Sequence, residues 1–124
     1  TLTGAVVVAL GSSVTGAMTN DKRLLSQLLA ASVKTNESIC ELPLVRDYRD
    51  GIKSSIADLQ NIGKVRGEAG SIIGGLFLEE FVDGKPWVHL DIAGTAWADG
   101  ESSYCSKGGT GSIVRTLLEY LAAL

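Results

Sequence analysis

The chain has 124 residues, of which 45% are hydrophobic and 20% are charged, a composition typical of a core-forming globular domain and not of a disordered chain. Fourteen acidic and eleven basic residues give a formal net charge of −3, which argues against nucleic acid or an anionic membrane as the main partner. The longest apolar runs are too short to span a bilayer and no basic signal-peptide segment precedes one, so we expect no membrane partner and a soluble protein.

The first predicted element is a strand at residues 5–10. Val6, Val7 and Val8 are consecutive, and an unbroken β-branched run is typical of a strand covered on both faces, as in a parallel sheet. Such a strand needs covering from further segments, so we expect a larger sheet than this chain provides. A turn-rich connector follows and includes a short strand at residues 14–18.

A helix is predicted from residue 21 to residue 34, with Asn20 or Thr19 as its N-cap and Asp21 favouring the positive end of the helix dipole. Its apolar side chains recur at helical spacing and predict one buried stripe. The stripe consists of Leu24, Leu25, Leu28, Leu29 and Val33. A short helix is expected after Pro43, and the glycine-rich stretch at residues 56–70 is expected to form an ordered loop.

The clearest helix is predicted at residues 71–82, with Glu79 and Glu80 facing water. Three glycines, Gly70, Gly74 and Gly75, each cost a helix roughly 1 kcal/mol relative to alanine, so this helix should require close packing. Its expected buried stripe is Ala69, Ile72, Ile73, Leu76 and Phe77.

The last predicted elements are a strand and a helix. In "WVHLDIAG" at residues 87–94, Val88, Leu90 and Ile92 alternate with polar residues, which is typical of a strand. A glycine-rich turn then leads to a C-terminal helix. Its expected buried stripe is Ile113, Val114, Leu117, Leu118 and Leu121. Strands alternating with helices predict an α/β fold with a mixed, mostly parallel sheet flanked by helices.

Two isolated features could carry chemistry. His89 is the only histidine and lies about 7 Å along the strand from Asp91, which could form half of a metal site. No HExxH or DxD motif accompanies the pair, so we favour a buried histidine held by hydrogen bonds near the carboxylate. A catalytic triad would need the same histidine, and no GxSxG motif is present. Cys40 and Cys105 are far apart without CxxC spacing, which favours reduced cytosolic thiols over a disulfide.

The stretch "GGTGS", from Gly108 to Ser112, precedes a helix and could offer backbone amides to an anion or nucleotide. It lacks the lysine and the spacing of a phosphate-binding loop. A simple N-cap turn, in which Ser112 or Thr110 accepts from the helix amides, is the favoured interpretation. The anion-binding module remains the alternative function.

Several stretches together resemble one family, the leucyl or cytosol aminopeptidases. They occur in the family's order and cover essentially the whole chain: "TLTGA" with "ALG", "PL" followed by "Y", "SIADLQNIG", "AG" with "FLEEFV", "WVHLDIAGTAW" and "GGTGSIVRTLLEYL". The resemblance implies a hydrolase that removes N-terminal residues, leucine and other apolar ones, from peptides. It also implies two divalent ions, zinc or manganese, that polarise the scissile carbonyl and deliver a hydroxide.

The resemblance further implies how this chain relates to the full-length enzyme. In the family, the metal ligands and the catalytic lysine and arginine lie in segments before "TLTGA". Residues 1–124 should therefore form the C-terminal portion of a single peptidase catalytic domain, without the upstream metal-binding half and the N-terminal domain. The chain alone should hold no metal, contain no catalytic residue and be inactive. The complete enzyme should be a cytoplasmic homohexamer that acts on peptides.

The same resemblance implies which residues contact substrate. Thr1 and Gly4 would border the pocket for the N-terminal side chain, and the backbone of Leu2 and Gly4 would hold the substrate by hydrogen bonds. Ala93 and Ala96 would form the floor of this pocket. Ile62 would contact the next residue of the peptide. Small side chains at these positions suit a concave apolar site, which must leave volume for its ligand.

Overall fold

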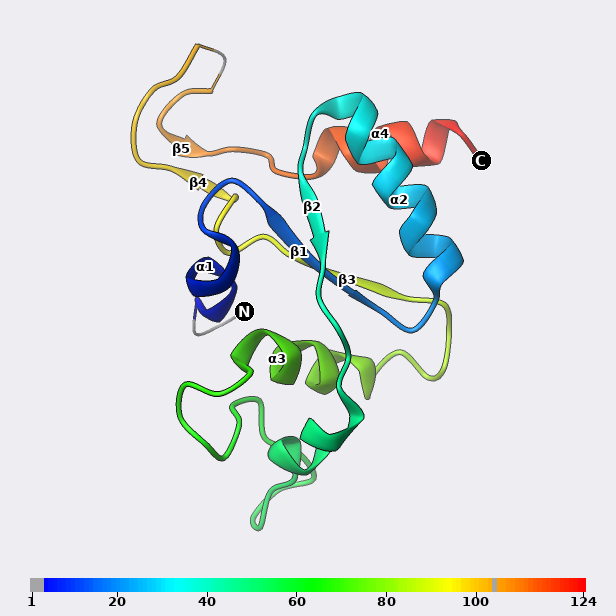
Figure 1. Cartoon of the computed structure of the whole chain (residues 1–124), viewed down its shortest axis with the longest axis vertical. Helices are drawn as coiled ribbons and strands as arrows, with labels where there is room; N and C mark the ends of the chain where they lie inside the picture. Colours follow the sequence, from blue (N-terminus) through cyan, green and yellow to red (C-terminus); the bar gives the residue numbers. More distant parts are fainter. Residues whose placement is uncertain (1–3, 104) are drawn as a thin grey trace.

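The computed structural model describes residues 4–103 and 105–124, and within them a mixed three-stranded sheet is flanked by helices (Figure 1). Its strands are β1 (Thr15–Thr19), β2 (Ile39–Glu41) and β3 (Val88–Asp91), in the order β2-β1-β3. Strand β1 runs parallel to β2 and antiparallel to β3. The expected α/β class with a mixed sheet is confirmed.

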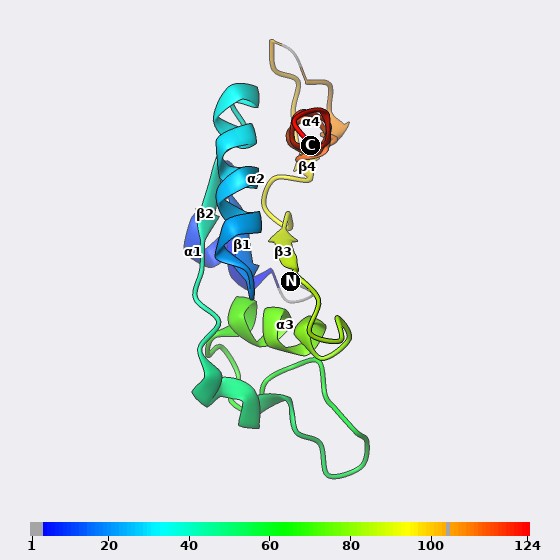
Figure 2. The ribbon, with the colours of Figure 1, turned by 90° about the vertical axis from the view of Figure 1, so that its right-hand side faces the viewer.

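Two pairs of helices flank this sheet. Helices α2 (Lys22–Thr35) and α4 (Val114–Ala122) pack together at one end. Helix α3 (Gly70–Glu79) and the 3₁₀-helix η1 (Arg46–Ile52) lie at the other end, as both views show (Figure 2). A short two-stranded ribbon of β4 (Trp97–Ala98) and β5 (Gly108–Gly109) lies toward the same end of the molecule as α4 (Figure 1). Among the described residues, no helix has the length and apolar character needed to cross a membrane.

The strand predicted at residues 5–10 is wrong, because this segment is a helix, α1 (Ala5–Leu10). It lies between two glycines with positive φ, Gly4 at 67° and Gly11 at 70°, so the chain can turn sharply at both ends. Only Val6 is buried, facing β1, where a Cβ on Gly16 would lie 3.0 Å from its Cγ2. Val8 is 92% exposed. Packing of one side chain on β1 has overridden the β propensity of the valine run.

Helix α2 forms where the sequence predicts it, but its N-cap differs from the prediction. The N-cap is Asp21, whose carboxylate accepts from the Leu24 amide at 3.0 Å. Thr19 instead donates its hydroxyl to the Trp87 carbonyl at 2.6 Å, and Asn20 donates its side-chain amide to the Lys85 carbonyl at 2.9 Å. Both therefore tie the start of α2 to the chain that enters β3. Along the helix, Leu25 and Leu28 of the expected stripe are buried, whereas Val33 is exposed.

Helix α3 ends at Glu79, three residues earlier than predicted. It packs closely against the sheet, as its glycines predict. A Cβ on Gly75 would lie 2.7 Å from the Met18 sulfur, so the helix backbone lies directly on β1. Ile73 and Leu76 of the predicted stripe are buried with Ile52 of η1, and the other three members lie partly buried against this cluster.

The expectation that Glu79 faces water is wrong. Its side chain is 8% exposed and accepts from Arg46 at 2.8 Å and from Arg49 at 2.6 Å. Arg49 also contacts Glu80. Two guanidinium groups from η1 compensate the burial of this carboxylate, so the ion pairs join η1 to the end of α3.

The predicted buried stripe of the C-terminal helix is also wrong for the most part. Ile113 is buried, but four members are exposed: Val114, Leu117, Leu118 and Leu121. The helix instead turns Thr116, which is fully buried, toward α2, where its hydroxyl lies 2.8 Å from that of Thr35. A polar contact, which apolar periodicity does not report, decides the orientation of α4.

Cys40 and Cys105 are free thiols.

Candidate functional site

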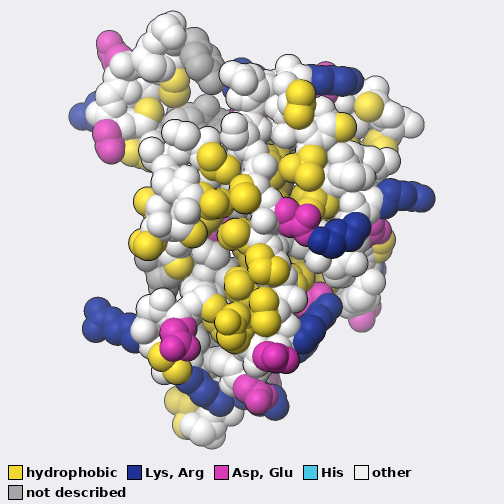
Figure 3. All heavy atoms as spheres, in the orientation of Figure 1, with side chains coloured by type: hydrophobic (Ala, Val, Ile, Leu, Met, Phe, Trp, Pro, Cys, Tyr) yellow, Lys and Arg dark blue, Asp and Glu magenta, His cyan; other side chains and the backbone are white. Residues whose placement is uncertain are grey.

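A hollow of about 1330 Å³ lies between α1, α3, the end of β3 and the loop at residues 61–69. Its apolar wall combines α1 and α3 side chains that are far apart in the sequence, including Val8, Ile72, Phe77 and Leu78. Hydrophobic side chains also gather over α1 and α3 on the face seen in Figure 3. A concave apolar wall of this kind suits the side chain of a ligand.

The structure brings two of the expected substrate residues together at this hollow. Ile62, on the loop, and Ala93, just after β3, both line it. Gly4 and Ala96 are not among its lining residues, although Gly4 caps the helix whose Ala5 does line it. Thr1 and Leu2 lie outside the described residues.

Sequence reasoning missed part of the wall. The valine run predicts a buried strand, and this prediction gives no signal that Val8 lines a pocket. Lys64, Arg66 and Glu68 also line the hollow from the loop and place charges beside its apolar wall. No motif marks these residues, and only the folding of the loop over α3 brings them to the site.

His89 and Asp91 line the same hollow from β3. The His89 ring stacks on Trp87 with 6.2 Å between centroids. Burial lowers the pKa of His89, and the nearby negative charge of Asp91 opposes this only in part. Asp91 is buried, and its Oδ1 accepts from the Ala93 amide at 3.2 Å. The carboxylate thus shapes the turn that carries Ala93.

Within residues 4–103 and 105–124, no group of three or more His, Cys, Asp or Glu side chains is brought together in a way that could hold a metal ion. His89 and Asp91 lie in the wall of the hollow.

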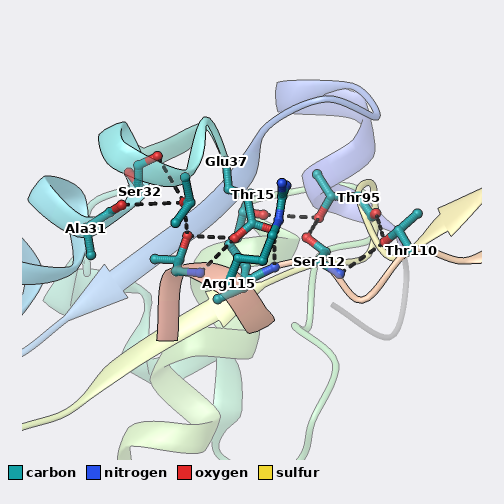
Figure 4. Close-up of polar contacts among 11 residues, drawn as sticks. Thr15, Ala31, Ser32, Glu37, Thr95, Thr110, Ser112 and Arg115 are labelled. Atoms are coloured by element: carbon teal, nitrogen blue, oxygen red, sulfur yellow. Dashed lines mark hydrogen bonds and ion pairs between the residues drawn. The ribbon is translucent and has the colours of Figure 1, made fainter. Parts of the chain in front are cut away.

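The segment at residues 92–96 connects the hollow to the rest of the fold. The amides of Thr95 and Ala96 both donate to the Ile92 carbonyl, at 3.0 and 2.9 Å, which closes a tight turn. On one side, a Cβ on Gly94 would lie 2.2 Å from the Gly11 carbonyl oxygen, so only glycine allows the turn to lie against the end of α1. On the other side, Thr95 lies in a group of hydroxyls (Figure 4).

The N-terminal end of α4 is already occupied by a carboxylate of the chain itself. Glu37, which follows α2, accepts from the Ile113 and Thr116 amides at 2.9 Å each and from the Thr116 hydroxyl at 2.7 Å (Figure 4). Arg115 lies 3.6 Å from the same carboxylate. Burial raises the pKa of Glu37, but the Thr116 and Ile113 hydrogen bonds and the Arg115 charge outweigh it, so the pKa is lowered below 4.5.

This arrangement opposes an anion-binding module at residues 108–112. The amides that would hold an external phosphate bond Glu37 instead, and the Ser112 amide donates to Thr110 Oγ1 at 3.1 Å. The expected local N-cap is wrong, because the Ser112 amide precedes the helix and no side chain of residues 108–112 accepts from an α4 amide. The helix itself is capped by Glu37, a residue distant in sequence.

Comparison with known proteins agrees with this geometry. Residues 1–118 match the cytosol aminopeptidase family, catalytic domain. A probable cytosol aminopeptidase of Alkaliphilus metalliredigens is 50% identical over 119 residues, which are 96% of this chain and 23% of that protein. One from Clostridium perfringens is 50% identical over 96% of this chain and 24% of its own length. The chain belongs to the cytosol aminopeptidase family.

Solved structures support the same conclusion about the fold. A mutant of tomato leucine aminopeptidase superposes with a TM-score of 0.87 and 38% identity over 98% of this chain and 23% of its own. The bottromycin maturation enzyme BotP in complex with Mn superposes with a TM-score of 0.88 and 43% identity, over 96% and 26%. The chain spans about a quarter of the length of the curated relatives it matches, 23% and 24% for the two named above.

Proposed function

We propose that the full-length protein is a metallo-aminopeptidase that releases leucine and other apolar residues from the N-termini of peptides. The observation that carries the proposal is the family match over residues 1–118, together with relatives that are named as aminopeptidases at 50% identity. The apolar hollow is consistent with an apolar substrate side chain.

In this proposal the chain is the C-terminal portion of a catalytic domain and supplies walls of the substrate pocket. Ile62 and Ala93 are favoured because both line the hollow. Gly4, Ala96, Thr1 and Leu2 are included on the family resemblance. The hollow exceeds the roughly 300–1,000 Å³ of an ordinary ligand pocket. We therefore propose that other segments of the full-length protein fill part of it.

The metal centre is proposed to lie in those other segments, because the family resemblance implies that the metal ligands precede "TLTGA". Two divalent ions, zinc or manganese, are proposed for the complete enzyme. One structural neighbour is a complex with manganese. A cytoplasmic homohexamer is proposed on the same resemblance. The chain's own contribution is to bind and orient the N-terminal residue of the peptide.

The experiment compares the full-length protein with residues 1–124 alone, on a leucine peptide with a free amino group and on its N-acetylated counterpart. With manganese or zinc added, the full-length protein should release leucine from the free peptide only, since an exopeptidase of this class recognises the terminal amine. Residues 1–124 alone should release none. Cleavage of the acetylated peptide, or metal-dependent turnover by residues 1–124 alone, would contradict the proposal.

A further inference from the structure

We propose that Thr95 is a positioning residue whose hydroxyl holds the turn at residues 92–96, and with it Ala93, in the orientation that binds the N-terminal side chain of the substrate. The inference rests on the proposed function, and it adds a role for a residue that does not line the hollow.

The Thr95 hydroxyl lies where three parts of the fold meet (Figure 4). Its Oγ1 is 3.0 Å from Oγ1 of Thr15, which is 1% exposed in the central strand β1. It also accepts from the Ser112 hydroxyl at 2.8 Å, in the loop before α4. A hydroxyl can donate one hydrogen bond and accept two, so Thr95 has the capacity for both contacts.

The backbone around Thr95 is held by the same loop. Thr110 donates its hydroxyl to the Thr95 carbonyl at 2.6 Å and its amide to the Ala96 carbonyl at 3.0 Å. Thr110 and Ser112 thus fix the outer half of the turn. The loop that holds the turn is itself fixed at its next residue, because the Ile113 amide donates to the Glu37 carboxylate.

The opposite side of the turn allows little movement. Gly94 lies so close to the Gly11 carbonyl that a Cβ would be 2.2 Å from its oxygen, and α1 beyond Gly11 forms part of the wall of the hollow. Ala93 therefore lies on a turn that is held between α1 on one side and three hydroxyls on the other. These are the hydroxyls of Thr15, Thr95 and Ser112. Loss of the Thr95 hydroxyl should move Ala93 relative to α1 and change the width of the pocket.

The test uses three variants of the full-length protein. Thr95→Val keeps the shape of the side chain but removes the hydroxyl, whereas Thr95→Ser keeps the hydroxyl. Ser26→Ala is the control, because it removes an exposed hydroxyl that donates to the Arg23 carbonyl within α2, away from the turn. Kinetics are measured with leucine and alanine amides, which differ in how much of the pocket they fill.

We expect Thr95→Val to lower kcat/KM for the leucine amide about tenfold relative to the alanine amide, mainly through KM, because a displaced wall weakens binding of the larger side chain. Thr95→Ser and Ser26→Ala should keep the wild-type ratio. Equal losses on both amides, or a Thr95→Ser variant as impaired as Thr95→Val, would overturn the inference.

Hydrogen exchange gives a readout that does not depend on activity. In Thr95→Val, the amides of Ala96 and Thr110 should exchange faster than in the wild type, while those of α2 remain unchanged. Unchanged exchange at both amides would overturn the inference even if the protein proves to have no peptidase activity, which would separately refute the proposed function. Ser112→Ala removes the donor to Thr95 and should give the same pattern if Thr95→Val does not fold.

Discussion

Replacing Glu37 by glutamine tests how far one carboxylate fixes α4. The side chain is 11% exposed and accepts three hydrogen bonds, from the amides of Ile113 and Thr116 and from the Thr116 hydroxyl. Glutamine keeps the shape of the side chain but has no charge and only one acceptor oxygen. At least one of the three donors should therefore lose its partner.

The magnitude follows from the contacts. Hydrogen bonds to a charged group contribute about 1.5–3 kcal/mol each and neutral ones about 0.5–1.5 kcal/mol. One lost bond and weaker remaining bonds should together cost about 2 kcal/mol of local stability, offset in part by relaxation of the loop. Because 1.4 kcal/mol corresponds to a factor of ten, the first turn of α4 should open roughly thirtyfold more often.

The effect should depend on pH in one direction. Burial raises the pKa of Glu37, and its hydrogen bonds and Arg115 outweigh this, so the folded-state pKa lies below the reference value of 4.5. The carboxylate therefore contributes its full stabilisation above about pH 4.5, the unfolded pKa, and loses it as the pH falls through the folded pKa. Wild type and Glu37→Gln should differ most near neutral pH and converge in acid.

Hydrogen exchange of the Ile113 and Thr116 amides in the full-length protein measures this opening directly. Glu119→Gln is the matched control, because Glu119 lies on the same helix but pairs with an exposed lysine, Lys34, at 2.7 Å. A surface ion pair of this kind contributes about 0–1 kcal/mol. Equal exchange in wild type and Glu37→Gln, or equal acceleration by Glu119→Gln, would refute the reasoning.

Two further predictions concern the hollow. Ala93→Phe should lower kcat/KM of the full-length enzyme for leucine amides at least tenfold relative to alanine amides, since pockets discriminate about 1–3 kcal/mol per methylene; equal losses on both would mean that Ala93 only packs. Gly94→Ala should lower the melting temperature, because its Cβ would meet the Gly11 carbonyl oxygen at 2.2 Å, and an unchanged melting curve beside the open-space control Gly100→Ala would contradict this close contact.

The sequence determined the elements whose side chains pack through apolar contacts in one periodic pattern. In α2 and α3, Leu25, Leu28, Ile73 and Leu76 are buried as the helical spacing predicts. Alternation likewise located β3. The family resemblance could also be found from the sequence, because its motifs are short runs of residues that occur in this chain in the family's order.

Tertiary contacts decided the features for which local pattern gives no signal or the wrong one. The valine run became a helix because Val6 packs on β1 between two glycine turns, although β-branched residues favour strands. The orientation of α4 depends on Glu37 and Thr116, polar groups whose partners are distant in sequence.

The candidate site shows the same division. Small residues such as Ala93 could be read as pocket residues only through the resemblance, whereas the hollow itself exists because α1, α3 and the loop at residues 61–69 converge. Hydroxyl contacts such as Thr15 with Thr95 join residues 80 positions apart. Threonine and serine occur on surfaces, in turns and in buried hydrogen bonds, so their spacing in the sequence does not reveal their partners. Only the folded chain brings these hydroxyls within hydrogen-bonding distance.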